Sequence, residues 1–205
     1  MNHLIIAGEI SGISRQTGDK PSAEADLLIP PQRDGVDPIT LYFKAWGVAA
    51  ETLRDGPVIL MGAVSVSQGV PSLAVSRVHL ASSLDGVELN SICLVGRAGR
   101  DPEMRYFESG AAVANLSLAV NRRRRDEGPD WFDLKIWGKQ AQVAADYVRK
   151  GSLLGIAGSF QVDFWTDRVT GEMRQKPVIH VDRLELLGSR RDAEGSREEG
   201  GGYAF

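Results

Sequence analysis

The amino-acid sequence predicts an all-β protein made of two tandem five-stranded barrels, each with one short helix, followed by a disordered C-terminal tail. Three observations lead to this prediction. The chain contains an internal repeat, each copy contains short apolar or alternating runs typical of strands, and the apolar pattern stops near residue 189. A chain of 205 residues has room for two small domains.

The internal repeat is carried by four pairs of similar segments. They are LIIAGEISG (4–12) with ICLVGRAGR (92–100), LYFKAWG (41–47) with FDLKIWG (132–138), VAAETLRDG (48–56) with VAADYVRKG (143–151), and AVSRVHLAS (74–82) with HVDRLELLGS (180–189). Each copy is about 80–100 residues long, which is longer than the repeating unit of a solenoid protein. The length fits two duplicated domains better. We therefore expect one domain at 1–84, a second at 88–189 and a tail at 190–205.

Within the second copy, strands are expected before and after one helix. Leu116 to Val120 and Phe132 to Trp137 are rich in residues that favour strands. From Gln140 to Lys150 the apolar residues recur at helical spacing, and Gly151 follows as the expected C-cap.

Two further strand-like runs, 152–162 and 178–187, follow the helix. Three strands, a helix and two strands is the element order of the five-stranded, partly open oligonucleotide-binding (OB) barrel. The remaining segment, GSRRDAEGSREEGGG, offers no face from which a core could form, so we expect it to be disordered.

Candidate binding residues concentrate in the second copy. Trp131 and Trp137 are an even number of residues apart in one expected strand, so both should point to the same face of the sheet. Trp165 lies in a polar, hairpin-like stretch with an expected tip at Thr170-Gly171, where a ring is poorly placed for a core.

Cations accompany these rings. Four consecutive arginines, Arg122, Arg123, Arg124 and Arg125, precede Trp131, and Arg97, Lys135 and Lys139 lie on or beside the expected strands. Flat rings that stack on bases, together with cations that track phosphates, are what binding of single strands without sequence preference requires. A structural role remains the alternative for each tryptophan, most evenly balanced for Trp137.

The first copy lacks most of these groups. In the alignment of the two copies, Thr40 corresponds to Trp131, and Pro31 to Asp34 correspond to the four arginines. Only Trp46 matches a ring of the second copy, Trp137. We expect residues 1–84 to keep the fold as a scaffold or oligomerisation domain, with weak DNA binding at best.

Residues 90–188 closely resemble the bacterial single-stranded DNA-binding protein family, and most of all its cyanobacterial or plastid-lineage forms. The resemblance rests on NSICLVGRAGRDPEMRYFESGAAVANLSLAVNR, DWFDLKIWGKQAQVAADYVRKGSLLGIAGSF and a WTD hairpin. It implies stacking roles for Trp131, Trp137 and Trp165. A further family tryptophan is absent, and Arg122 to Arg125 stand in its place, so we expect one stacking contact fewer, with arginine stacking as its partial replacement.

The resemblance also implies partners. The family assembles four OB folds, so two copies per chain suggest a homo-oligomer, either a dimer that reaches the same count or a tetramer. Family tails dock replication and repair proteins; Phe205 is reminiscent of that tip, although the acidic run and the proline are missing. The expected location is the cytoplasm, associated with the nucleoid, and a plastid-type compartment is an alternative.

Several function classes are disfavoured by the sequence. The net charge of −3 argues against a nucleic-acid binder, but the arginine run concentrates positive charge that the sum hides.

Cys93 is the single cysteine, so a disulfide within the chain is excluded. No phosphate-binding loop, metal cluster or nucleophile–base pair is visible, so we expect neither catalysis nor a cofactor. A protein-interaction module with little DNA affinity is the main rival. No apolar run approaches the roughly 18 residues of a membrane span, and no basic leader precedes the first strand.

Overall fold

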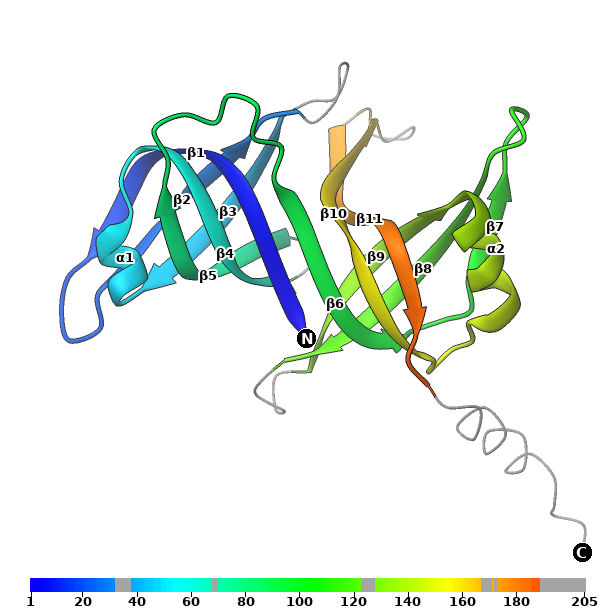
Figure 1. The fold of residues 1–205 in the computed structure, drawn as a ribbon. Coiled ribbons are helices and arrows are strands. Elements are labelled where there is room, and N and C mark those ends of the chain that lie inside the picture. The colour runs from blue at the N-terminus through cyan, green and yellow to red at the C-terminus, as the bar shows by residue number, and fades with distance from the viewer. Residues whose placement is uncertain (32–37, 68–69, 123–127, 167–170, 172, 189–205) are drawn as a thin grey trace, which may run out of the picture.

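The structure is a computed structural model that describes residues 1–31, 38–67, 70–122, 128–166, 171 and 173–188. In these residues eleven strands form one continuous sheet, accompanied by two short helices. The prediction of an all-β fold is therefore confirmed. Figure 1 shows the first half of the chain on one side of the central strands and the second half on the other.

The second half contains a closed five-stranded barrel. The elements of this half of the chain are β6 (Asn90–Ala98), β7 (Glu103–Tyr106), β8 (Ala112–Asn121), β9 (Pro129–Trp137), α2 (Gly138–Tyr147), β10 (Leu153–Thr166) and β11 (Met173–Leu186). The ring runs β6-β8-β9-β11-β10 and returns to β6. The β11–β9 pair is parallel and the others are antiparallel.

The first half contains the same kinds of element in the order that the sequence predicted. They are β1 (Asn2–Gln16), β2 (Ser22–Ile29), β3 (Ile39–Trp46), α1 (Val48–Thr52), β4 (Gly56–Ser67) and β5 (Val70–Leu80). β1 pairs with β2 and β4, β3 pairs with β2 and β5, and β4 pairs with β5. The β3–β5 pair is parallel.

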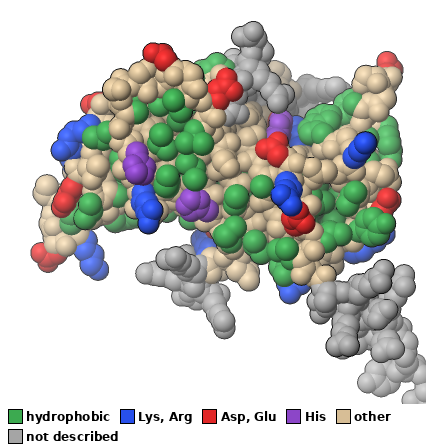
Figure 2. Space-filling model, in the orientation of Figure 1, with side chains coloured by type: hydrophobic (Ala, Val, Ile, Leu, Met, Phe, Trp, Pro, Cys, Tyr) green, Lys and Arg blue, Asp and Glu red, His purple; other side chains and the backbone are tan. Residues whose placement is uncertain are grey.

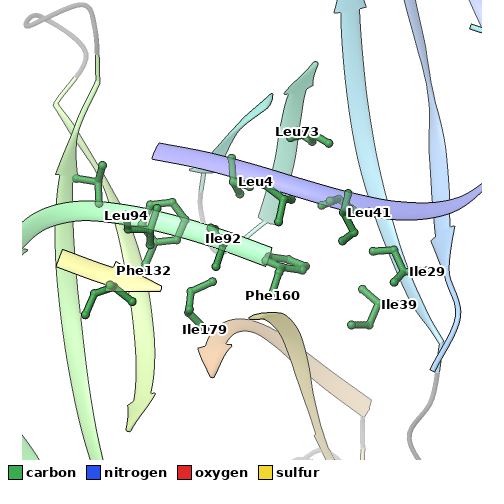
Figure 3. Packing of buried hydrophobic residues seen from close by; sticks show 14 of the residues in the cluster. Leu4, Ile29, Ile39, Leu41, Leu73, Ile92, Leu94, Phe132, Phe160 and Ile179 are labelled. Carbon is green, nitrogen blue, oxygen red and sulfur yellow. The ribbon is translucent and has the colours of Figure 1, made fainter. Parts of the chain in front are cut away.

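Alternation of apolar and polar residues places the core. In β3, for example, Leu41, Phe43 and Ala45 are buried, while Tyr42 and Trp46 on the other face are exposed. The buried residues of both halves form one continuous cluster, because β1 and β6 pair side by side at the centre of the sheet. Figure 3 shows part of this cluster, with Leu4 on β1 close to Ile92 and Leu94 on the paired strand β6.

Backbones approach each other closely at one bulge in the β10–β11 hairpin. The register shifts between Ala157 and Gly158, and a Cβ built on Gly158 would lie 2.1 Å from the carbonyl oxygen of His180. Only glycine leaves room for this approach. The β4–β5 hairpin repeats the arrangement, since a Cβ on Gly62 would lie 2.1 Å from the carbonyl oxygen of Ala74.

Three expectations need correction or lie outside the description. The second half has an additional strand, β7, which pairs only with β8; four mixed residues, EMRY, are too few to give a periodic signal. The helix spans Gly138–Tyr147 rather than 140–150, and its C-cap is Val148 in an extended conformation. Gly151, expected as the cap, instead has a φ of 90° in the turn before β10. Residues 189–205, which include the whole expected tail at 190–205, lie outside the described residues.

Candidate nucleic-acid interface

The outer face of β9 carries two of the three predicted stacking rings. Trp131 and Trp137 are 50% and 43% exposed, whereas Phe132, Leu134 and Ile136, which alternate with the outward-pointing residues, are buried in the barrel. The even spacing that the sequence showed thus places both rings on one solvent-facing surface. Tryptophan side chains are usually more deeply buried than this in a protein without a ligand.

Trp131 lies across the end of the first barrel strand. A Cβ built on Gly99 would meet the indole at 2.4 Å, and the Ser117 hydroxyl oxygen at 2.8 Å. Because Gly99 has no side chain, the indole can lie close to the backbone while half of its surface stays in solvent. The ring is therefore supported from one side and open to a ligand on the other.

Trp137 is held by a ring that the sequence did not single out. The side chain of Phe107 stacks on it with ring centroids 5.8 Å apart and planes inclined by 20°. Phe107 lies in the turn after β7 and is 48% exposed. Stacked pairs of this kind fix ring orientation and extend the flat surface available to a base. The unexpected strand β7 is what brings Phe107 here, which is why a sequence reading that missed β7 left its role open.

Four of the predicted cations have described side chains, and carboxylates pair with two of them. The Lys135 ammonium lies 2.5 Å from Asp163, and the Arg122 guanidinium lies 2.8 Å from the buried Asp130. Arg97 is exposed and donates a hydrogen bond to the Gly151 carbonyl oxygen at 2.8 Å. Lys139 is exposed in the first turn of α2.

A polar groove crosses the same region. It has a volume of about 200 Å³ and is lined on its charged side by Arg100, Arg105, Lys135 and Lys176 together with three carboxylates. Arg100, Arg105 and Lys176 were not among the predicted binding residues, because isolated basic residues in strands and turns carry no sequence signal of their own. On the face drawn in Figure 2, Lys and Arg side chains are scattered among acidic ones rather than gathered in one band.

Several predicted residues cannot be placed in this surface. Trp165 lies near the end of β10, opposite Arg174 in the β10–β11 ladder, and its side chain is outside the description. Arg123, Arg124, Arg125 and Phe205 lie outside the described residues altogether. Their roles stay predictions.

The corresponding face of the first half differs in charge. The Tyr42 hydroxyl donates to the Glu24 carboxylate at 2.7 Å, and the Lys44 ammonium lies 3.4 Å from the same oxygen. The hydrogen bond from Tyr42, followed by the contacts with Lys44, lowers the pKa of Glu24. Asp26, on the same strand as Glu24, and Glu9, on the neighbouring strand β1, are exposed. In the aligned segments, Glu9 stands where the second copy has Arg97.

In the part of the chain that the structure describes, no group of three or more His, Cys, Asp or Glu side chains is arranged to hold a metal ion. Neither described helix has the length and apolar character needed to cross a lipid bilayer.

Comparison with known proteins gives a consistent result. The model of the single-strand binding protein family matches residues 89–187. The chain is 63% identical over 108 residues to "Single-stranded DNA-binding protein 1" of Synechocystis sp. (strain ATCC 27184 / PCC 6803 / Kazusa), a match that covers 52% of this chain and 89% of that protein. It is 60% identical over 106 residues to the single-stranded DNA-binding protein of Thermosynechococcus vestitus, covering 52% and 88% of the two chains.

Among solved structures, the fold is similar to that of the wild-type single-stranded DNA binding protein from Thermus aquaticus. The TM-score is 0.66 at 20% sequence identity, and the match covers 92% of this chain and 94% of that chain. Unlike the sequence matches, this likeness extends over both halves of the molecule.

Proposed function

The chain belongs to the single-strand binding protein family, and we propose that it binds single-stranded DNA by stacking bases on tryptophans and holding phosphates with arginines and lysines. Single-stranded DNA binding itself follows from the family and agrees with the sequence prediction. The family is one of binding proteins rather than enzymes, which agrees with the expectation of a non-enzymatic protein.

The observation that carries the residue-level proposal is the surface of β9. Trp131 and Trp137 share one solvent-facing side of the strand, and a groove lined by four cationic and three anionic side chains lies beside that strand. Stacking is worth about 1–3 kcal/mol per base and tolerates any sequence, because every base has a π-face. Counterion release from phosphates adds affinity that falls with salt. Trp165, Arg97, Lys139 and Arg122 to Arg125 complete the proposed surface.

We further propose that residues 1–84 are a second, degenerate OB domain, duplicated from an ancestor shared with residues 88–189. Matching hydrogen bonds in the two halves support it. The Asn2 side chain accepts from the backbone N–H of Val64 at 3.1 Å and donates to its carbonyl at 2.6 Å. Asn90 makes the same two bonds with Phe160, at 2.9 and 2.6 Å.

The parallel strand pair supports the duplication as well. Phe43 lies opposite Leu73 in the β3–β5 ladder, and Leu134 lies opposite Ile179 in the β11–β9 ladder. In the aligned segments Phe43 corresponds to Leu134. A parallel pair in an otherwise antiparallel arrangement, found at the same place in both halves, is more simply explained by duplication than by coincidence.

On this proposal the first half is a scaffold, and the oligomer is built from copies of the whole chain. A dimer would present four OB folds, the number that the family resemblance implies, and a tetramer is the alternative. The acidic residues Glu9, Glu24 and Asp26 on the first half's outer face argue that this half contributes little to DNA affinity. Phosphates would be repelled there.

Cellular roles are proposed from the same family. They are protection of single strands in replication, recombination and repair, in the cytoplasm at the nucleoid, with Phe205 in the tail recruiting replication or repair proteins. A pull-down that loses no partner when Phe205 is deleted would remove the tail proposal.

The experiment that tests the function is a titration of the full chain's tryptophan fluorescence with poly-dT at two salt concentrations. Deep quenching that weakens with salt is expected. The Trp131→Ala variant should show less quenching and lower affinity at unchanged circular dichroism. Absence of quenching, together with no retention on single-stranded DNA, would favour the rival reading of an OB-fold interaction protein.

A further inference from the structure

A small apolar pocket opens beside Trp131, at the junction between the two halves. Its volume is about 200 Å³, and its apolar lining consists of Val66, Trp131, Phe132, Phe160, Pro177 and Ile179. Val66 comes from β4 of the first half, and the other five come from the second half. The pocket is therefore complete only when both halves are present.

The wall contributed by the first half is fixed by a buried carboxylate. Asp130, which is 3% exposed, accepts a hydrogen bond from the backbone N–H of Val66 at 3.0 Å. The same oxygen, Oδ1, accepts a hydrogen bond from the Arg122 guanidinium at 2.8 Å. Because Asp130 directly precedes Trp131, one residue links the wall of the pocket, the start of the arginine run and the stacking ring.

The floor of the pocket is rigid. Phe160 is fully buried, and the Asn90 side chain bonds both its N–H and its carbonyl oxygen. Phe132 and Ile179 are also nearly fully buried. Figure 3 shows Phe132, Phe160 and Ile179 in the core next to β6. These buried side chains lie beneath the pocket and hold the exposed and partly exposed lining residues in place, as expected of preformed small-molecule sites.

Size and lining indicate the ligand. An apolar cavity of about 150 Å³ is known to hold one benzene ring, so a pocket of about 200 Å³ accommodates a single six-membered ring with its substituents. The fused rings of a purine need more room. Lys176, which is half exposed, also lines the pocket, with its ammonium 2.8 Å from Asp133. Two of its N–H donors remain for the phosphate that a bound base brings with it.

The geometry points to a pocket for one pyrimidine base of the bound strand, inserted edge-first behind Trp131 at the junction of the halves. This inference rests on the proposed function and refines it. The first half then has a role in DNA binding without touching phosphates, because it supplies Val66. The aligned first-half residues are Thr40 for Trp131 and Val64 for Phe160, so the first half lacks the two rings that define the pocket.

Photo-crosslinking of the full chain distinguishes entry into the pocket from stacking on the surface. The probe is oligo-dT in which single thymidines are replaced by 5-iododeoxyuridine, and adducts are located by peptide mass spectrometry. Val66 and Pro177 line the pocket and are only partly exposed, so a strand that stays on the outer faces of Trp131 and Trp137 does not cover them. Adducts on Val66 or Pro177 are expected. Adducts confined to Trp131, Trp137 and other exposed residues overturn the inference while leaving the proposed function intact.

A matched pair of variants gives a second readout. Val66→Phe fills the pocket, whereas Val70→Phe makes the same change on the same hairpin at an exposed residue outside the lining. We expect Val66→Phe to weaken binding of oligo-dT roughly tenfold, the loss of about one stacked base, and to leave binding of oligo-dA unchanged. Val70→Phe should change neither. Equal effects of both variants, or an equal loss for both oligonucleotides, overturn the inference.

Val66→Ala gives a graded comparison at the same position. It keeps the Asp130 hydrogen bond to the backbone but removes two methyl groups from the wall, so oligo-dT binding should weaken less than in Val66→Phe. A loss in Val66→Ala equal to that in Val66→Phe counts against filling of the pocket. If the wild-type chain binds neither oligonucleotide, the proposed function fails, and the pocket with it.

Discussion

Leu4 lies opposite Ile92 in the antiparallel pairing of β1 with β6, and the two residues hold the same place in the two copies of the repeat. The neighbouring pairs, His3 with Cys93 and Ile5 with Ser91, extend symmetrically on either side. An antiparallel contact between equivalent residues has the geometry of an isologous interface, the kind that joins two identical subunits through a twofold axis. Here both partners belong to one chain, so the pairing of the halves cannot be lost by dilution.

Removing either equivalent asparagine should destabilise the protein by a similar amount. Asn90→Ala deprives the backbone N–H and carbonyl of Phe160 of their partners, and Asn2→Ala does the same for Val64. Partly buried backbone groups left unpaired cost about 1–3 kcal/mol. Urea denaturation should show a loss of this size in each variant. Asn121→Ala, at an exposed strand end, is the control and should stay within about 0.5 kcal/mol of the wild type.

Truncation of the stacking rings should weaken DNA binding without unfolding the protein. Trp131→Ala removes a half-exposed ring from β9, and Trp165→Ala removes the ring predicted in the β10–β11 hairpin. Each loss is expected to be about 1–3 kcal/mol in binding free energy. Trp46→Ala in the first half is the matched control, since this ring is 49% exposed but lies on the acidic face. Affinity for oligo-dT, measured by anisotropy, should be unchanged in that control; unchanged affinity in both Trp131→Ala and Trp165→Ala would refute the stacking surface.

A methyl group at the β10 bulge should be poorly tolerated. Gly158→Ala places a Cβ 2.1 Å from a backbone carbonyl oxygen, which cannot rotate away as a side chain would. We expect the free energy of unfolding to fall by about 2 kcal/mol or more, at the upper part of the usual overpacking range. Gly188→Ala, whose Cβ would meet no atom within 4 Å, should behave like the wild type. Equal thermal melting of the two variants would contradict the close approach.

Reversing charge on the first half should create salt-dependent DNA binding there. Glu9→Arg combined with Asp26→Ser gives that face two residues of the second copy, Arg97 and Ser117. Each cation that neutralises a phosphate steepens the dependence of log affinity on log salt by about 0.7 for a single strand. Glu51→Arg in α1, which repeats the Glu→Arg change elsewhere in the first half, is the control. No difference between the two variants at low salt would show that the acidic face is remote from the strand's path.

The sequence by itself determined the order of the elements apart from β7, the outward direction of Trp131 and Trp137, and the family. These depend on local periodicity and on residues close together in the chain, as in β9, where alternation alone sets which side chains are buried. The same locality explains the misjudged end of α2: its C-cap depends on the extended conformation of Val148, and a glycine three residues later was the stronger signal.

Tertiary structure decided what lies next to what. The stacking of Phe107 on Trp137 depends on the short strand β7, the ion pair of Arg122 with Asp130 depends on burial, and the hydrogen bond from Val66 to Asp130 joins residues 64 positions apart. Contacts of this kind arise when separate elements pack around a shared core. The two residues are distant in the chain, so the contact produces no periodic pattern in the sequence around either of them. For that reason the stacking face could be predicted from the sequence, whereas the pocket between the halves could not.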